Sequence, residues 1–201
     1  MSGVDDLATV VQQAVRGLGT ERERKDIERA ERKARKEAAG ETDTAAAVDV
    51  LLALPDVSTT RACIASHTRG GYMALKAATT HAKQGDGVVC YLSWYPHMQD
   101  PNAAEPMQVY RYASEVDQLQ IPILIFIGDE EQYQRRRSIE TAVQSLQQAG
   151  RDATLVVYPG VGRGFDFRPP HVRTLADDLA SQHALNLAAR FINRHLGDHA
   201  K

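Results

Sequence analysis

Three loops of the sequence carry side chains that could take part in catalysis or binding. Each loop follows a short apolar run, and together they contribute Thr68, Glu131 and Arg163. A threonine hydroxyl becomes a useful nucleophile only when a neighbouring group accepts its proton, whereas arginine is well suited to binding carboxylates and phosphates. His67 lies directly before Thr68, and histidine is the residue type that most often acts as a general base. These residue types point either to hydroxyl-based hydrolysis or to the binding of an anion.

Alternating strands and helices are predicted to position these loops. Apolar runs predict strands over 61–66, 87–94, 121–128 and 153–160, and the intervening patterns predict helices over 70–82, 107–119, 133–149 and 175–196. The almost continuous apolar run at 121–128 is typical of a strand buried on both faces. The alternation favours a parallel sheet with helices on both faces, in which functional loops follow the carboxyl ends of the strands.

The first 55 residues are predicted to be helical. One helix covers 4–18, a second covers 21–41, and a third begins at a cap on Thr42 or Thr44 and ends before Pro55. The second helix is nearly all charged residues and alanine, with acids and bases three and four positions apart. This spacing favours a solvated helix over a basic arm that binds RNA.

The composition is that of an ordinary globular protein. Hydrophobic residues make up 43% of the 201 residues, and the net charge of -2 argues against nucleic acid or an acidic membrane as a partner held by bulk charge. The sequence shows neither a signal-peptide pattern nor a membrane-length apolar run, so we expect a cytoplasmic protein. Cys63 and Cys90 are expected to be core residues outside any disulfide framework. We expect no metal or cofactor, because metal-ligand spacings and a phosphate-binding Gly-Lys motif are absent from the sequence.

Taken in order, the three loops resemble the dienelactone hydrolase family of α/β-hydrolases. That family carries a Gly-x-Cys-x-Gly-Gly elbow, an acid in a later Gly-x-x-Asp turn, and a histidine in a Tyr-Pro-Gly-x-x-His-Gly-Phe loop. The corresponding stretches here are SHTRGG (66–71), GDEE (128–131) and YPGVGRGF (158–165). The resemblance covers roughly residues 43 to 197. It implies an α/β fold of the truncated α/β-hydrolase type, with three layers, about four parallel strands, helices on both faces and preceding N-terminal helices.

The family's three catalytic positions hold different residues in this sequence. The nucleophile position falls on Thr68, the acid position on Glu131 and the histidine position on Arg163, while Ser66 replaces the first glycine of the elbow. Arg163 cannot act as a general base, because arginine stays protonated in proteins. The apex of the elbow requires a positive φ, where a β-branched residue is an outlier. Thr68 therefore either strains the elbow or relaxes it, and we expect the three residues not to work as a triad.

Three interpretations of the replaced residues stay open. Glu131 and Arg163 could form an ion pair, or Arg69 and Arg163 could bind an anion such as a small carboxylate. His67 could instead supply the base for Thr68, although adjacent residues at a strand end usually point to opposite sides. The residues expected to line a pocket or an oxyanion site are His67, Arg69, Tyr72 and Trp94.

The strands with which family members normally begin are not predicted here. The resemblance therefore implies the loss of an oxyanion donor and leaves the strand at 61–66 at the sheet edge, with unpaired backbone groups. We expect the N-terminal helices or a protein partner to cover that edge, with a homodimer as the first choice. The aromatic and Met residues of the loop over 93–105 are expected to form either a second contact surface or an ordinary pocket wall. The predicted domains are a charged helical segment over 1–42 and a truncated dienelactone-hydrolase-like domain over 43–201.

These features support three hypotheses about function. The favoured one is a dienelactone-hydrolase-like protein that has lost ester and lactone hydrolysis and serves a structural, assembly or binding role. The second is an active hydrolase of small esters or lactones with an atypical site based on Thr68. The third is an anion or small-molecule binder that uses Arg69 and Arg163. Fold similarity alone does not choose among them, because function depends on the site.

Overall fold

The computed structural model describes residues 21–55, 57, 60–101, 103, 108 and 111–197. The helix predicted over 4–18 lies outside these residues. The chain divides into two compact units, residues 1–40 and 41–201. Within the described ranges, the helices are too short or too polar to cross a membrane.

A single helix, α2 (Glu21–Ala53), takes the place of the two helices predicted between residues 21 and 54. The predicted cap at Thr42 or Thr44 is wrong, because α2 runs through Gly40 and both threonines without a break. A glycine inside a helix costs only about 1 kcal/mol relative to alanine. The flanking runs of Ala, Glu, Lys and Arg favour continuation of the helix on both sides.

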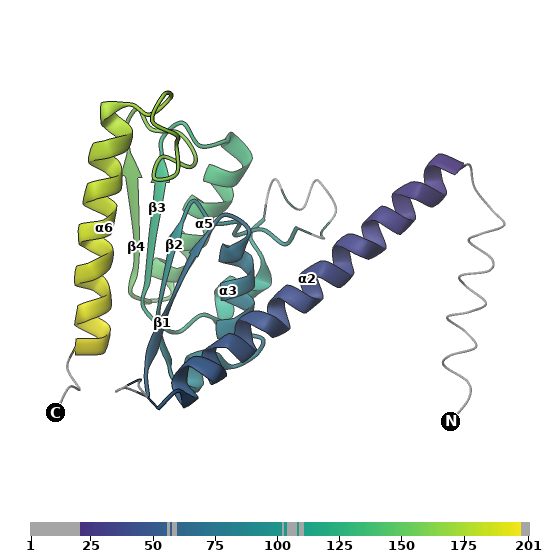
Figure 1. Ribbon diagram of the computed structural model, residues 1–201, viewed down its shortest axis with the longest axis horizontal. Helices are drawn as coiled ribbons and strands as arrows, with labels where there is room; N and C mark the ends of the chain where they lie inside the picture. Colours follow the sequence, from purple (N-terminus) through teal and green to yellow (C-terminus); the bar gives the residue numbers. More distant parts are fainter. Residues whose placement is uncertain are drawn as a thin grey trace. The chain divides into compact units, whose positions relative to one another are not determined.

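A parallel sheet of four strands forms the centre of the second unit (Figure 1). The strands are β1 (Ala62–His67), β2 (Val88–Trp94), β3 (Ile123–Gly128) and β4 (Ala153–Tyr158). Their order in the sheet is β1-β2-β3-β4, so β1 and β4 are the two edges among the described strands. Every residue of β3 is buried, which confirms the prediction from its continuous apolar run.

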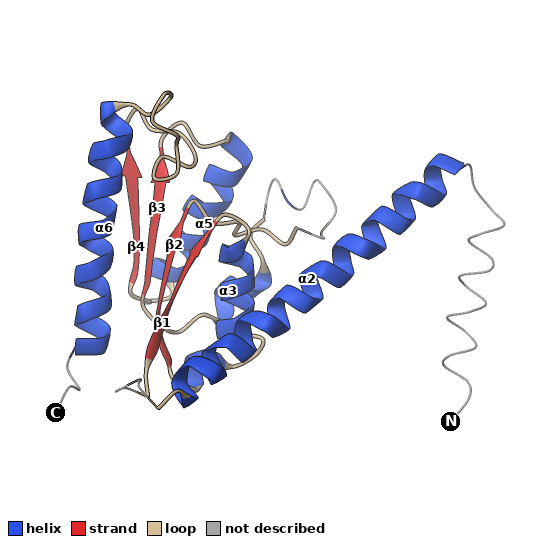
Figure 2. Cartoon of the chain, viewed as in Figure 1, coloured by secondary structure: helices blue, strands red, loops and turns tan. Residues whose placement is uncertain are grey.

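Helices cover both faces of this sheet, as predicted (Figure 2). Helix α6 (Leu175–Leu196) packs against β1, β2 and β3, whereas α3 (Gly70–Ala78) and α5 (Tyr133–Gln148) lie on the opposite face. Two short 3-10 helices, η1 (Lys83–Gly85) and η2 (Ser114–Gln118), complete the described elements. The helix predicted over 107–119 is wrong in part, because residues 111–113 are not helical and residues 114–118 form a turn of 3-10 helix.

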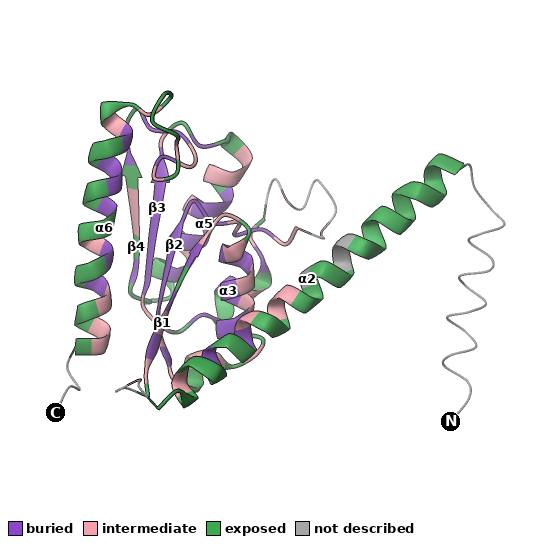
Figure 3. Cartoon of the chain, viewed as in Figure 1, coloured by how far each residue is buried: buried purple, intermediate pink, exposed green. Residues whose placement is uncertain are grey.

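Burial follows these layers, with the central strands β2 and β3 almost wholly buried and the outer face of α6 exposed (Figure 3). Of the two alternatives for the aromatic and Met residues of the loop over 93–105, burial excludes an exposed contact surface at Trp94, Tyr95 and Met98. Trp94 is 6% exposed, and Tyr95 and Met98 are 0% exposed. The N–H of Tyr95 donates to the carbonyl of Phe126, which draws the start of this loop onto the end of β3.

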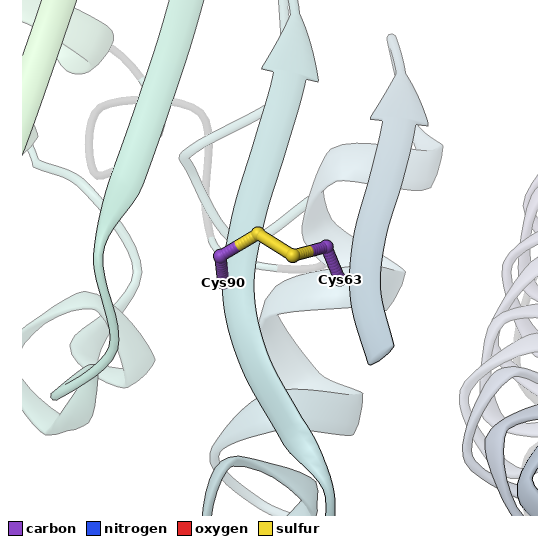
Figure 4. Close-up of a disulfide and its surroundings, with 2 residues drawn as sticks. All are labelled: Cys63 and Cys90. Atoms are coloured by element: carbon purple, nitrogen blue, oxygen red, sulfur yellow. A yellow bond between two sulfur atoms is a disulfide. The ribbon is translucent and has the colours of Figure 1, made fainter. Parts of the chain in front are cut away.

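Cys63 and Cys90 form a disulfide between neighbouring strands (Figure 4), which corrects the expectation of two separate core cysteines. Ala62 pairs with Val88, but Cys63 pairs with Cys90, because the register shifts by one residue at this point. The shift sets the two cysteines directly opposite each other, with their Cα atoms 4.6 Å apart. Without it, Cys63 would face Val89, so the disulfide depends on a register that the sequence pattern does not reveal.

Candidate active site

Thr68 lies at the apex of a tight turn between β1 and α3, and the turn has the backbone conformation of a strained elbow. Its φ is 52°, in the left-handed region that β-branched residues avoid. Of the two outcomes considered for Thr68, the strained elbow is the one observed. The carbonyl of Thr68 accepts hydrogen bonds from the N–H of Gly71 at 3.1 Å and of His97 at 2.8 Å. Such strain costs on the order of 1–3 kcal/mol and persists only where the surroundings enforce it.

The surroundings that enforce the elbow come from β2 and the loop that follows it. A Cβ on Gly71 would lie 2.4 Å from Cβ of Pro96, so only glycine allows α3 to begin this close to the loop. The hydroxyl of Tyr91 donates to the carbonyl of Gly71 at 2.9 Å. The hydroxyls of Ser66 and Ser93 are 2.9 Å apart in a hydrogen bond across the two strands. Ser66 therefore ties β1 to β2 from the strand, as expected for a residue outside the turn apex.

Glu131 and Arg163, which follow β3 and β4, form the predicted ion pair. Nη1 of Arg163 donates to Oε2 of Glu131 at 3.0 Å, and the backbone N–H of Gln132 donates to Oε1 at 3.0 Å. The Glu131 side chain is 1% exposed and that of Arg163 is 24% exposed. The guanidinium also lies over the ring of Tyr95, with Cζ 5.2 Å from the centroid. Arg163 thus holds a buried carboxylate and packs on an aromatic face.

Two loops must approach closely for this pair to form, and their backbones do. A Cβ on Gly128 would lie 1.8 Å from the carbonyl oxygen of Val161, so a side chain at this position is excluded. The N–H of Glu130 donates to the same carbonyl at 3.1 Å. Oδ1 of Asp129 accepts from the N–H of Gly160 at 2.8 Å, and Gly160 itself has a φ of 65°. Backbone contacts therefore hold the loops after β3 and β4 together independently of the ion pair between Arg163 and Glu131.

The geometry gives Thr68 no base from this pair. Within the described residues, the Thr68 hydroxyl has no hydrogen bond to Glu131 or Arg163. A second cation, Arg135 on α5, lies in the field of the pair. Partial burial and then the positive charge of Arg163 lower the pKa of Arg135, while Glu131 opposes that change. Arg163 and Arg135 both stay protonated, so neither side chain can accept a proton from Thr68.

A second polar cluster centres on His67, and its partner Asp166 was not singled out from the sequence. Nε2 of His67 lies 3.0 Å from Oδ2 of Asp166, and the hydroxyl of Tyr95 donates to Oδ1 of the same carboxylate. Burial, and then the hydrogen bond to Asp166, raises the pKa of the Tyr95 phenol, so Tyr95 remains the donor. The His67 ring stacks on Trp94 at 4.8 Å and contacts Phe167 at the same distance.

The contacts show which way the His67 side chain points. Its ring packs against Trp94 and against Asp166 and Phe167, which follow β4. The acidic residue in FDF (165–167), three positions after Arg163, was the only signal in the sequence, and its meaning depends on a contact 99 residues distant.

Tyr72 and Arg69 belong to other surroundings than Glu131 and Arg163. Tyr72 is buried on α3, and its hydroxyl donates to Oε1 of Glu115 at 3.4 Å. Burial, and then the charge of Glu115, raises the pKa of the Tyr72 phenol. Arg69 is exposed and occupies the N-cap position of α3. The anion site formed by Arg69 and Arg163 stays a prediction.

A pocket of about 470 Å³ opens beside Glu115 rather than beside the elbow. Its lining residues are Asp100, Ala103, Arg111, Tyr112, Ala113, Ser114, Glu115 and Asp117. Thr68, Glu131 and Arg163 are not among them. The pocket therefore does not present a substrate to the three family positions.

Comparisons with known proteins place these features in a family. The sequence matches the model of the dienelactone hydrolase family over residues 9–196, beginning well before the expected start at residue 43. No curated protein sequence matched the chain. A hyperthermophilic esterase from the archaeon Pyrobaculum calidifontis is 18% identical with a TM-score of 0.54, over 75% of this chain and 59% of the esterase.

Esterase 2 of Thermogutta terrifontis, phosphonylated by sarin, is 19% identical with a TM-score of 0.50, over 66% of this chain and 56% of the esterase. At these identities the structural likeness supports the fold alone. The chain spans 53% to 59% of the length of the structures it resembles. The described part is thus a partial α/β-hydrolase-like fold, and from its sequence match the chain belongs to the dienelactone hydrolase family.

Proposed function

We propose that this chain has lost the ester and lactone hydrolysis implied by its family and serves a structural, assembly or binding role. The observation that carries the proposal is the ion pair between Glu131 and Arg163. It fills the acid and histidine positions with a carboxylate and a guanidinium that neutralise each other. Arginine cannot accept the proton of the Thr68 hydroxyl, and the loss of general-base assistance typically costs on the order of 10²–10⁴-fold.

Hydrolysis of p-nitrophenyl acetate and of a small dienelactone tests this proposal. We expect the full-length protein to hydrolyse neither faster than Thr68→Ala prepared in parallel, which controls for traces of other esterases. Wild-type turnover that disappears in Thr68→Ala would overturn the proposal. The double variant Thr68→Cys with Arg163→His asks whether a restored triad is sufficient. We expect little gain, because no described strand precedes β1 to carry the loop that supplies the family's second oxyanion donor.

One alternative is favoured by a specific observation, the contact between His67 and Asp166. The carboxylate can hold a hydrogen on Nε2 and leave Nδ1 as an acceptor, so His67 could assist a reaction at the retained elbow. In that case, turnover would be lost in His67→Ala and in Thr68→Ala but kept in Arg163→Gln.

A cytoplasmic location also stays a prediction, and the disulfide between Cys63 and Cys90 is more typical of oxidising compartments.

A further inference from the structure

The outer edge of β1 carries backbone groups that point away from the sheet. The N–H of Ala62 donates to the carbonyl of Gly87 at 2.8 Å, and the N–H of Thr68 donates to that of Trp94 at 3.2 Å. Backbone groups alternate in direction along a strand. Cys63, Ala65 and His67 therefore direct their N–H and C=O groups away from β2. Since β1 ends the order of the described strands, these groups face outward from the sheet.

This edge lacks the features that usually prevent pairing with another strand. Its sequence, ACIASH, contains no proline, lysine or acidic residue. Ala65, at the middle of the outward-facing residues, is exposed and has a small side chain. The disulfide from Cys63 to Cys90 ties β1 to its neighbour and so keeps the edge extended. An extended, uncharged edge of this kind is a template for a further strand.

We propose that β1 pairs with β1 of a second copy of this chain, antiparallel and with the two-fold axis between the two Ala65 residues. The proposal rests on the assembly role proposed above and names its partner. In this register Ala65 faces Ala65, and Cys63 faces His67 of the other copy. Every outward N–H of one copy then meets an outward C=O of the other, since an isologous interface is self-complementary.

An exposed apolar side chain beside the edge would also gain cover from this pairing. Phe167 contacts the ring of His67 at 4.8 Å, yet 66% of its surface is exposed. A strand paired with β1 would pass alongside His67 and reduce the exposure of this apolar ring. The two neighbouring registers that keep side chains on their faces centre on Ile64 or on Ser66, and they leave His67 or Cys63, respectively, beyond the paired strand residues.

Light scattering coupled to size exclusion tests the pairing in the full-length protein. We expect a mass twice that of the 22.1 kDa chain at tens of micromolar. Ala65→Pro removes an outward N–H and leaves the bonds to β2 intact, so it should weaken dimerisation at least about 100-fold with an unchanged circular dichroism spectrum. Ala65→Ser keeps the N–H and should remain dimeric. If Ala65→Pro does not fold, Ala65→Lys places a charge at the axis and should give a monomer.

Hydrogen exchange separates this proposal from other ways to cover the edge. The amides of Cys63, Ala65 and His67 should be protected in the wild-type dimer and exchange rapidly in Ala65→Lys. A wild-type monomer would overturn the pairing, and protected amides in that monomer would assign the edge to the chain's own N-terminal residues. A dimer that survives Ala65→Pro or Ala65→Lys unchanged would overturn it as well. Hydrolysis by an intact dimer would overturn only the proposed loss of activity.

Discussion

Arg163 occupies the family's histidine position and makes structural contacts there. A histidine there would shuttle a proton, because its charge changes near neutral pH. Arg163 instead keeps its charge, donates to Glu131 at 3.0 Å and lies over the ring of Tyr95. Glu131 is almost fully enclosed, and a buried carboxylate requires a partner to remain ionised. Arg163, at the family's histidine position, is therefore the counterion of Glu131, at the family's acid position.

Replacement of Arg163 by Gln should therefore destabilise the fold. Removal of one partner leaves the Glu131 carboxylate buried without its cation, at a cost of about 2–3 kcal/mol because Arg163 is itself partly exposed. The double variant with Glu131→Gln should recover part of this loss, since neither side chain is then charged. Urea unfolding of the two single variants and the double variant measures the coupling. If the losses of unfolding free energy in the two single variants simply add up in the double variant, the two side chains do not interact directly.

At the scale of elements, the disulfide joins the edge strand to the strand beside it. Cys63 and Cys90 are 27 positions apart, and closing a loop of this length in the unfolded chain corresponds to about 3–4 kcal/mol of stabilisation. Cys63→Ser combined with Cys90→Ala should lower the free energy of unfolding by about that amount. A reducing agent should have the same effect on the wild type and no further effect on the double variant. If reduction leaves the wild type unchanged, the bond does not contribute to stability in solution.

The elements themselves were the most predictable part of the molecule. The apolar run at 121–128 predicted β3 because a strand covered on both faces has no polar side, and α6 was predicted with its observed bounds. The predicted helix break near Thr44 failed because propensity over a long window outweighs one glycine and two threonines. The helix predicted over 107–119 was wrong at 111–113, and its apolar residue Val116 is buried from a short 3-10 turn instead.

The candidate site was predictable only where sequence order fixed it. The positions of Thr68, Glu131 and Arg163 after β1, β3 and β4 follow from strand order, since parallel strands bring their carboxyl ends to one edge. The contact of His67 with Asp166 and the facing cysteines depend on register and on long-range packing. These properties are set by the whole sheet, and no local pattern encodes them.

At the scale of the whole molecule, the two units differ in what holds them together. The first is described only through the part of α2 up to Gly40. The described side chains before Gly40 are exposed, and ion pairs at i,i+4 join Lys25 to Glu21 at 2.7 Å and Arg35 to Glu31 at 3.5 Å. The second is stabilised by a continuous hydrophobic core that includes β3. Exposed ion pairs of this kind each contribute only about 0.3–0.5 kcal/mol. The two units should therefore open with very different free energies.

Hydrogen exchange at neutral pH should show this difference directly. We expect the amides of residues 25–39 to exchange at least about 100-fold faster than those of β3, because fraying of an exposed helix requires no loss of core contacts. Raising the salt concentration to about 1 M screens the ion pairs and should speed exchange further in residues 25–39 while leaving β3 unchanged. The Ala65→Lys variant provides the control for assembly. Strong protection of residues 25–39 that disappears in this variant would mean that the charged helix contributes to the dimer, and protection equal to that of β3 in both proteins would contradict an independently opening unit.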